Sequence, residues 1–313
     1  MRPRFLLLAV VAALIVVVGC GSSGSQRPQT ASASAKRATA AQTTASHVVV
    51  IVMENKEYGQ VIGSRSSPYV TALARRYAAA RRFYGIRHPS LPNYLALTGG
   101  STFGVKSDCT GCQQSGQSIA DQLDAAQLSW KAYMGGMPRS CFKGTSSGRY
   151  AKKHDPFMYY RSVADNPARC ANVVPEKQLA SDIGAGTLPS FSFLAPDLCD
   201  DSHDCGIATG DRYLARTVPG ILGALGPQGF LVLTWDEGSS GAGCCGVAKG
   251  GRIPTIVAGP GVKRAARPST PYTHYSTLRT IEDAFGLPHL AGAASASTTS
   301  LAAVFKSGTP QIR

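Results

Sequence analysis

Two pairs of oxygen-bearing side chains, each directly after an apolar run, are the first candidates for chemistry in this chain. Glu54 and Asn55 follow one run, and Asp236 and Glu237 follow another. Carboxylate and amide oxygens are ligands that hard divalent cations prefer in proteins. Acids gathered in one cleft resist ionisation unless a cation compensates their charge. The two pairs therefore predict a divalent metal site, provided that the fold brings them together.

The segment 88–94, HPSLPNY, offers a candidate nucleophile in Ser90. Prolines on both sides of the serine fix backbone φ and stiffen the segment. Ser90 precedes a predicted helix, so a helix cap is the alternative role of its hydroxyl. A helix start also presents backbone N–H groups to a phosphate, and a neighbouring metal would activate the hydroxyl. Asn93 is then a candidate donor to a phosphoryl oxygen, and His88 is a second substrate-binding candidate.

Several histidines are candidates for metal binding or proton transfer. The segment 200–204, DDSHD, gathers acids around His203 between two cysteines, and Asp201 there is a further metal-ligand candidate. An ordinary solvated loop is the alternative for this segment. His274 opens the last predicted helix, where capping is the alternative to catalysis. His154 has a surface or capping position as its alternative.

The elements that must position these side chains alternate between strands and helices. Continuous apolar, β-branched runs predict strands buried on both faces, and apolar residues spaced by three or four predict helices. The predicted strands are 48–53, 191–195, 230–235 and 253–258. The predicted helices are 69–80, 119–126, 211–225 with a kink or break at Pro219, and 275–285.

This alternation is typical of an α/β fold, here a three-layer sandwich with a mostly parallel central sheet between helices. Ligands of such sheets bind beyond the carboxyl ends of the strands. Three of the predicted strands end in acid or amide side chains. The candidate ligands therefore lie where the fold class predicts a site.

The first 46 residues predict export and a tether. Two arginines precede an uncharged apolar run, and Cys20 follows small residues. This pattern predicts a lipoprotein-type signal peptide over residues 1–20, with ordinary signal cleavage as the alternative. Residues 21–46 are rich in Ser, Thr, Ala and Gln and predict a disordered linker. Residues 47–313 then suit one domain, exported and either lipid-anchored to the outer face of the cell membrane or secreted.

Eight further cysteines, an even number, predict disulfides in an oxidising compartment. The candidate pairs are Cys109–Cys112, Cys199–Cys205 and Cys141–Cys170. The adjacent Cys244 and Cys245 either bridge each other or pair elsewhere. A zinc site is the rival interpretation of the first pair, although no second pair at finger-like spacing follows it.

The formal net charge is +14, from 32 Lys and Arg against 18 Asp and Glu. The basic residues are scattered in short doublets and form neither a stripe nor a known nucleic-acid-binding module, so we expect no nucleic-acid partner. An exported basic protein is instead expected to meet anionic substrates or anionic envelope polymers.

Six short motifs together resemble the bacterial phosphoesterase family of secreted acid phosphatases and phospholipases C. In chain order they are MENKEY at 53–58, HPSLPNYLAL at 88–97, KHDPF at 153–157, DSHD at 201–204, TWDE at 234–237 and HYSTL at 274–278. The resemblance spans nearly all of residues 48–287. The short chain and its motifs are most similar to small secreted acid phosphatases of the phosphatidylinositol 3-phosphatase type.

The resemblance implies an alkaline-phosphatase-like fold and assigns roles to the candidate residues. The metal ligands that it implies are Glu54, Asn55, Asp236 and Glu237. Ser90 would accept the phosphoryl group, and His203 and His274 would complete a second metal site or protonate the leaving group. The inserted Cys244 and Cys245 depart from the family pattern near the expected pocket mouth, which leaves the substrate open.

We therefore predict an exported, metal-dependent phosphoesterase domain over residues 47–313. An acid phosphatase acting on phosphomonoesters through a phosphoserine is the first interpretation, with phosphoinositides as candidate substrates and membrane contact through lipidated Cys20. A phospholipase C or phosphodiesterase acting on lipid headgroups is the enzyme alternative. A non-catalytic lipoprotein that binds phosphate or metal is the second alternative.

Overall fold

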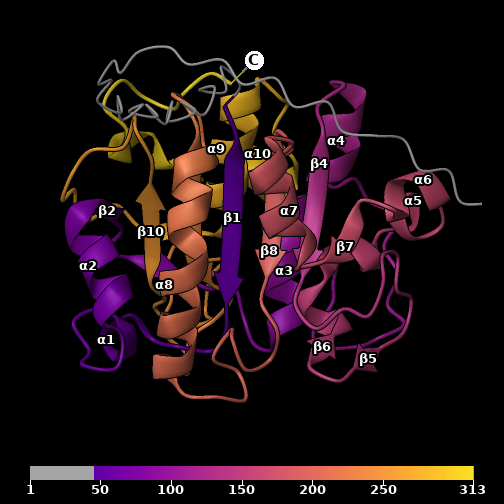
Figure 1. The fold of residues 1–313 in the computed structure, drawn as a ribbon. Helices are drawn as coiled ribbons and strands as arrows, with labels where there is room; N and C mark the ends of the chain where they lie inside the picture. The colour runs from indigo at the N-terminus through magenta and orange to yellow at the C-terminus, as the bar shows by residue number, and fades with distance from the viewer. Residues whose placement is uncertain (1–45, 313) are drawn as a thin grey trace, which may run out of the picture. The chain divides into compact units, whose positions relative to one another are not determined.

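The computed structural model describes residues 46–312 of the chain (Figure 1). The predicted signal peptide, 1–20, lies outside these residues, as does the predicted linker, 21–46, apart from Ser46. Within the described part, no helix combines the length and the apolarity that crossing a bilayer requires.

Seven strands form one central sheet in the order β2-β10-β9-β1-β8-β4-β7. Five neighbouring strands are parallel, whereas β10 is antiparallel to β9 and β2 is antiparallel to β10. The sheet strands are β1 (Val48–Met53), β2 (Ala78–Ala79), β4 (Trp130–Met134), β7 (Val173–Pro175), β8 (Phe191–Ala195), β9 (Phe230–Trp235) and β10 (Thr255–Ala258). The mostly parallel sheet confirms the predicted fold class.

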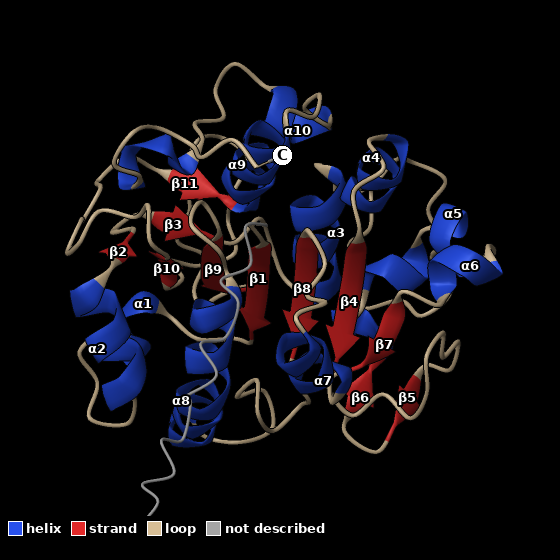
Figure 2. Ribbon diagram, turned by 45° about the horizontal axis from the view of Figure 1, so that its top comes forward, coloured by secondary structure: helices blue, strands red, loops and turns tan. Residues whose placement is uncertain are grey.

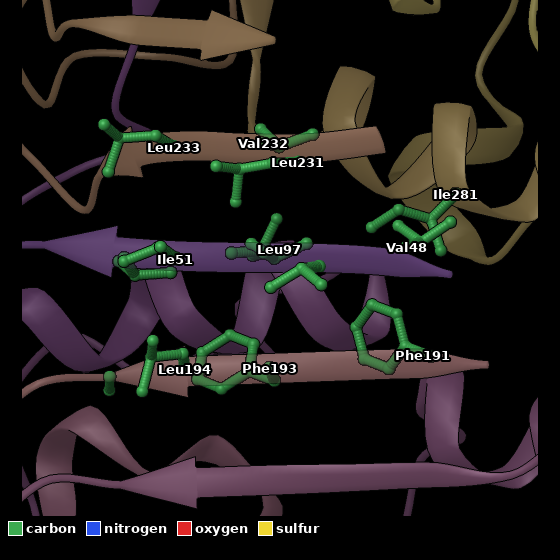
Figure 3. Close-up of a cluster of buried hydrophobic side chains, with 14 of the residues drawn as sticks. Val48, Ile51, Leu97, Phe191, Phe193, Leu194, Leu231, Val232, Leu233 and Ile281 are labelled. Atoms are coloured by element: carbon green, nitrogen blue, oxygen red, sulfur yellow. The ribbon is translucent and has the colours of Figure 1, made fainter. Parts of the chain in front are cut away.

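The middle strands form the centre of the hydrophobic core. Every residue of β1, VVVIVM, is buried, as is every residue of β8 and β9. Figure 3 shows Ile51 of β1 between Leu233 of β9 and Leu194 of β8. A strand covered by helices on both faces must be apolar at every position, which explains why these runs do not alternate.

Helices cover both faces of the sheet and make three layers (Figures 1 and 2). One face carries α2 (Pro68–Arg76), α7 (Gln178–Ala185) and α8 (Ile207–Ala224). The other carries α3 (Ser90–Gly99), α4 (Ile119–Ala125), α9 (His274–Phe285) and α10 (Ala291–Ala294). The predicted three-layer sandwich is therefore confirmed.

Short elements fill the connections between these layers. The helices among them are α1 (Tyr58–Val61), α5 (Arg161–Ala164), α6 (Pro167–Cys170) and the 3-10 turns Lys152–His154, Pro156–Tyr159 and Leu301–Val304. The strands among them form the pairs β3 (Phe83–Tyr84) with β11 (Tyr272–Thr273), and β5 (Ser146–Ser147) with β6 (Tyr150–Ala151).

Several element boundaries differ from the prediction. The helix predicted to run to residue 80 ends at Arg76, because Ala78 and Ala79 pair with β10 at the sheet edge. The helix α8 begins four residues earlier than predicted and continues through Pro219. The strand predicted from residue 253 starts at Thr255, after a proline that has no N–H for a sheet bond. The short strands β4 and β7 were not predicted.

All eight described cysteines form disulfides. The bridges are Cys109–Cys112, Cys141–Cys170, Cys199–Cys205 and Cys244–Cys245. The three pairs predicted from spacing are confirmed, and the adjacent cysteines bridge each other. A bridged first pair has no free thiolates to bind zinc, so the rival zinc interpretation is not supported.

Candidate active site

The carboxyl ends of β1 and β9 bring the two polar pairs to one place. These strands are parallel neighbours with Met53 opposite Trp235, so both pairs leave the sheet at the same edge. The backbone N–H of Asn55 donates to Asp236 Oδ1 at 3.0 Å, and Asn55 Nδ2 donates to Glu54 Oε2 at 3.2 Å. Asn55 has a φ of 58°, a left-handed conformation that asparagine adopts more readily than most residues.

Ser90 is the first residue of α3, and its hydroxyl meets this cluster. Ser90 Oγ donates to Glu54 Oε2 at 3.1 Å, and the residue is 2% exposed. The N-cap residue of α3 is Pro89, so the alternative role of Ser90 as the helix cap is not supported. One turn later, the hydroxyl of Tyr94 donates to Glu54 Oε1. The serine hydroxyl is thus held against a strand-end carboxylate.

Asn93 is engaged differently from its predicted role. Its Oδ1 accepts the backbone N–H groups of Ile86 at 2.7 Å and Arg87 at 3.1 Å. Its Nδ2 donates to the carbonyls of Arg87 at 2.6 Å and Pro89 at 3.2 Å. These bonds use both lone pairs and both hydrogens of the amide. Asn93 therefore braces the loop before α3, and its Nδ2 also lies 3.4 Å from Glu237 Oε2; its predicted contact with a phosphoryl oxygen stays a prediction.

His88 also links loops. Its Nδ1 lies 2.8 Å from Glu237 Oε2, and its Nε2 lies 3.0 Å from the carbonyl oxygen of Ser240. Both ring nitrogens are therefore engaged by the loop that follows β9. This arrangement holds Glu237 at the edge of the cluster, and the predicted substrate-binding role of His88 stays a prediction.

His154 lies inside the cluster, so the surface or capping position that was the alternative to a functional role is not observed. Its Nε2 is 3.3 Å from Glu54 Oε1, and its Nδ1 is 3.3 Å from Asp201 Oδ2. The ring stacks on Tyr94 with 5.4 Å between centroids. The available signal was the motif at 153–157, which contributed to the family resemblance but not to the predicted site.

The loop after β8 brings Asp201 and His203 to the same edge. The backbone N–H of Glu54 donates to the carbonyl of Asp201 at 3.0 Å, and Asp201 Oδ1 accepts the N–H of His203 at 2.7 Å. His203 Nδ1 lies 2.6 Å from Asp204 Oδ1, and its Nε2 lies 3.1 Å from Lys153 Nζ. An ammonium group only donates, so Nε2 accepts from Lys153, and the ring hydrogen on Nδ1 faces Asp204.

Lys153 and Asp108 complete the site and were not among the predicted residues. Lys153 Nζ is 3.3 Å from Asp108 Oδ2, and Asp108 Oδ1 accepts the backbone N–H of Leu91 at 3.0 Å. One of the N–H groups at the start of α3 is therefore already bound by a carboxylate. The other N–H groups of this helix start keep their predicted role in phosphate binding as a prediction, and Lys153 lies as a cation beside the cluster.

His274 is 1% exposed at the start of α9. Its Nε2 lies 2.6 Å from the carbonyl oxygen of Asp236, and its ring meets Phe83 edge-on at 5.9 Å between centroids. Burial lowers the pKa of His274 to about 4, so the ring is neutral at neutral pH and donates Nε2–H to that carbonyl. The histidine supports the backbone of Asp236, and its predicted role in catalysis stays a prediction.

Burial shifts the pKa values of the clustered groups. The pKa of Glu54 is raised well above its usual range by burial and by the charges of Asp236 and Asp201. Burial also raises the pKa of Asp236, that of Asp201 to about 7, and that of Glu237 to about 9. Burial lowers the pKa of His154 to about 3, so its neutral ring adds no compensating charge. These acids therefore need protons or a cation.

The donor set fits a divalent cation. Ligand atoms of Glu54, His154 and His203 all lie within 4.8 Å of one another. Asp236 Oδ2 is buried without a hydrogen-bond partner among the described residues. The contact of Asp204 with His203 Nδ1 is the outer-shell arrangement that orients metal-binding imidazoles. Imidazole nitrogens with carboxylate oxygens suit first-row divalent metals.

Known proteins are similar to this chain over most of its length. The model of the Phosphoesterase family matches residues 64–288. Phosphatidylinositol-3-phosphatase of Mycobacterium tuberculosis is 31% identical over 244 residues, which cover 77% of each chain. An acid phosphatase of Aspergillus fumigatus is 28% identical over 76% of this chain, which spans about half of the fungal protein, 54%.

Solved structures share the fold at low sequence identity. A Vibrio parahaemolyticus protein of the alkaline phosphatase superfamily superposes with a TM-score of 0.54 at 14% identity, covering 77% of this chain and 66% of that protein. The lipoteichoic acid synthase LtaP of Listeria monocytogenes gives 0.53 at 10% identity, covering 78% and 72%. The chain therefore belongs to the Phosphoesterase family and is a phosphoric ester hydrolase with an alkaline-phosphatase-like α/β fold.

Proposed function

We propose that this chain is a metal-dependent acid phosphatase that hydrolyses phosphomonoesters through a phosphoserine at Ser90. The observation that carries the proposal is the buried hydroxyl of Ser90, 3.1 Å from Glu54 Oε2 and within a cluster of raised-pKa acids. The names of the mycobacterial and fungal relatives, a phosphatidylinositol-3-phosphatase and an acid phosphatase, support this reaction class.

Ser90 is the proposed nucleophile, and Glu54 orients it. The hydroxyl hydrogen points to Glu54 Oε2, which leaves the lone pairs of Ser90 Oγ free for attack on phosphorus. Glu54 holds Ser90 Oγ in position, and a cation bound by the surrounding acids would lower the pKa of the hydroxyl, whose proton passes to solvent water. The Oγ–P bond forms as the bond from phosphorus to the leaving oxygen breaks, and water then releases phosphate from the serine.

A divalent cation is held in this proposal by residues from four segments, which are the ends of β1 and β9, the loop after β8 and the 3-10 turn Lys152–His154. The proposed ligands and their near neighbours are Glu54, Asn55, Asp236, Glu237, Asp201, His154 and His203. A bound cation would neutralise phosphoryl oxygens and favour the deprotonated serine. The unpartnered Oδ2 of Asp236 supports this set, as does the approach of ligand atoms of Glu54, His154 and His203 within 4.8 Å of one another.

Lys153 is a further proposed partner of the phosphoryl oxygens. Its ammonium group lies beside Asp108 and His203, where a phosphate dianion would find the nearest positive charge. His274 is proposed as a positioning residue for Asp236, since its Nε2 is bound to that carbonyl. The leaving oxygen then takes its proton from water, because both predicted acids, His203 and His274, are engaged in other roles.

Export and a lipid-derived substrate are further parts of the proposal. Four disulfides in the described residues support folding in an oxidising compartment. Phosphorylated lipid headgroups are candidate substrates, which the name of the mycobacterial relative supports. The predicted lipid anchor at Cys20 lies outside the described residues and stays a prediction.

Turnover of p-nitrophenyl phosphate and of bis-p-nitrophenyl phosphate tests the proposal. Ser90→Ala should lower kcat on the monoester by at least about a thousandfold, whereas Ser192→Ala, at a buried serine of β8, should keep it within about twofold. Chelation should abolish turnover, and a divalent metal should restore it. Near-wild-type turnover by folded Ser90→Ala would refute the nucleophile, and faster turnover of the diester would favour the phosphodiesterase alternative.

A further inference from the structure

A groove of about 640 Å³ lies along helix α2, on the flank of the sheet where β2 forms the edge. Its walls include Arg65 before the helix, Arg75 and Arg76 in the last turn, and Arg264 from the segment after β10. None of the residues that line it belongs to the candidate active site. The volume is within the range that binds ligands larger than a single phosphate ion.

The charged residues that line this groove are all arginines, and we call it the arginine groove. Arg65, Arg75, Arg76 and Arg264 are all exposed, and no acidic residue lines the groove. Among residues 46–312, none of the four takes part in an ion pair. Four positive charges around one groove, none of them in an ion pair among the described residues, repel one another and attract anions.

The helix itself does not need these arginines. At its start, Asp211 of α8 accepts the backbone N–H groups of Tyr69 at 3.1 Å and Val70 at 2.8 Å. At its end, Arg267 donates to the carbonyls of Ala74 and Tyr77. Both ends of α2 are thus already satisfied by buried or half-buried partners. The arginines of the groove are therefore available to a ligand.

The spacing of the charges favours an extended ligand. The nine residues of α2 span about 13 Å at the helical rise of about 1.5 Å per residue. Arg65 precedes the first residue of this helix, and Arg76 is its last residue. One phosphate group cannot reach arginines at both ends, whereas a chain of phosphates can. Guanidinium groups match phosphate oxygens in bidentate geometry.

The chemistry of the lining narrows the class of partner. No aromatic side chain lines the groove, so it has no platform on which nucleic-acid bases would stack. The apolar side chains that line the groove, Pro68 and Ala72, are small, so the groove has no large apolar side chain to insert into a bilayer. We propose that the arginine groove binds a linear polyanion that carries phosphate groups in series, independently of catalysis at Ser90.

Fluorescence anisotropy with end-labelled inorganic polyphosphate tests this site. The groove variant is Arg65→Gln/Arg75→Gln/Arg264→Gln, which leaves Arg76 on the ring of Tyr77. At about 0.15 M salt, the variant should raise Kd at least about tenfold. Because each lost phosphate contact removes about 0.7 from the salt slope of log K, that slope should fall by about 2.

A charge-matched variant on the other flank of the sheet is the control. Lys143→Gln/Arg161→Gln/Lys177→Gln removes the same formal charge from exposed positions around α5 and β7. It should change Kd for polyphosphate less than about twofold. Both triple variants are titrated in the Ser90→Ala background, so that hydrolysis does not shorten the chain, and both are checked for folding by circular dichroism.

Three outcomes would overturn the proposal. Equal weakening in the control would reduce the effect to net charge. Single-stranded DNA that binds as tightly as polyphosphate, with the same loss in the groove variant, would indicate a nucleic-acid surface. Anionic phospholipid vesicles that bind through the groove, while polyphosphate does not, would indicate a membrane surface. In the presence of wild-type Ser90, the groove variant should keep its turnover of p-nitrophenyl phosphate, which separates loss of this site from failure of the catalytic proposal.

Discussion

Divalent cations should stabilise the folded chain against heat, because buried acids with raised pKa values gather at the strand ends. A ligand at a hundredfold excess over its Kd adds about 2.7 kcal/mol to the free energy of unfolding. For a domain of this size, about 1 kcal/mol raises Tm by about 2 °C. We therefore expect a Tm increase of about 5 °C when Mg²⁺, Mn²⁺, Ca²⁺ or Zn²⁺ saturates the site. Differential scanning fluorimetry after chelation and metal add-back measures this shift.

The pH dependence of that stabilisation follows from Asp201 and Glu237. Burial raises their pKa values to about 7 and about 9, and a carboxylate must lose its proton to bind a metal. At pH 6, ionising Asp201 costs about one pKa unit, or about 1.4 kcal/mol, and this cost disappears at pH 8. The apparent Kd of the metal should therefore fall at least about tenfold between pH 6 and pH 8.

In the metal-free chain, stability depends on pH in the opposite direction. Between the ordinary pKa of a carboxyl and its raised folded value, the folded state binds more protons than the unfolded state, so the free energy of unfolding falls as pH rises. Asp236→Asn should abolish the metal-induced Tm shift, whereas Asp165→Asn, at an exposed acid, should keep it. An equal shift in both variants, or a larger shift at pH 6 than at pH 8, would refute this reasoning.

Three further predictions concern stability. Asn93→Ala removes four hydrogen bonds to the loop before α3 and should lower the free energy of unfolding by about 3 kcal/mol in urea denaturation; a loss below about 1 kcal/mol would contradict the bracing role. Glu282, buried on α9, has a pKa raised to about 8 by burial, so Glu282→Gln should reduce the fall of unfolding free energy between pH 5 and pH 8 by about 3.5 kcal/mol; an unchanged pH dependence would contradict this. The double variant Cys141→Ser/Cys170→Ser opens a bridge between residues 29 apart and should cost about 3 to 4 kcal/mol; wild-type resistance to urea would argue against the bridge.

The buried parallel strands could be predicted from the sequence because short apolar runs bounded by polar residues fit a strand better than a helix. β1 and β9 are six-residue apolar segments, so their existence, their bounds and the polar pairs that follow them came from hydrophobicity alone. β7 has three residues and ends in Pro175, and β4 contains Lys131, so neither has a distinctive pattern. Their strand character comes from pairing with neighbours that are distant in the chain.

The candidate site could be predicted only in part, because a polar residue in a motif does not show which partner it binds. Asn93 and His88 have the donors and acceptors that a phosphate-binding residue needs, yet both are engaged by loops of the chain. The same groups satisfy buried backbone atoms, which would otherwise cost free energy. Sequence spacing cannot separate these two uses, since the loops become neighbours only after the sheet assembles.

His154 shows what the assembled site adds to the chemistry. A histidine between two acids would be expected to carry a positive charge, and its neighbours Glu54 and Asp201 are 3.3 Å away. Burial instead lowers its pKa to about 3, so the ring is neutral and leaves both acids uncompensated. Lys153 is already paired with Asp108. Charge balance at this edge of the sheet therefore requires protons on the acids at low pH, or a divalent cation at higher pH. The metal dependence and the pH dependence of stability consequently test the same arrangement of residues.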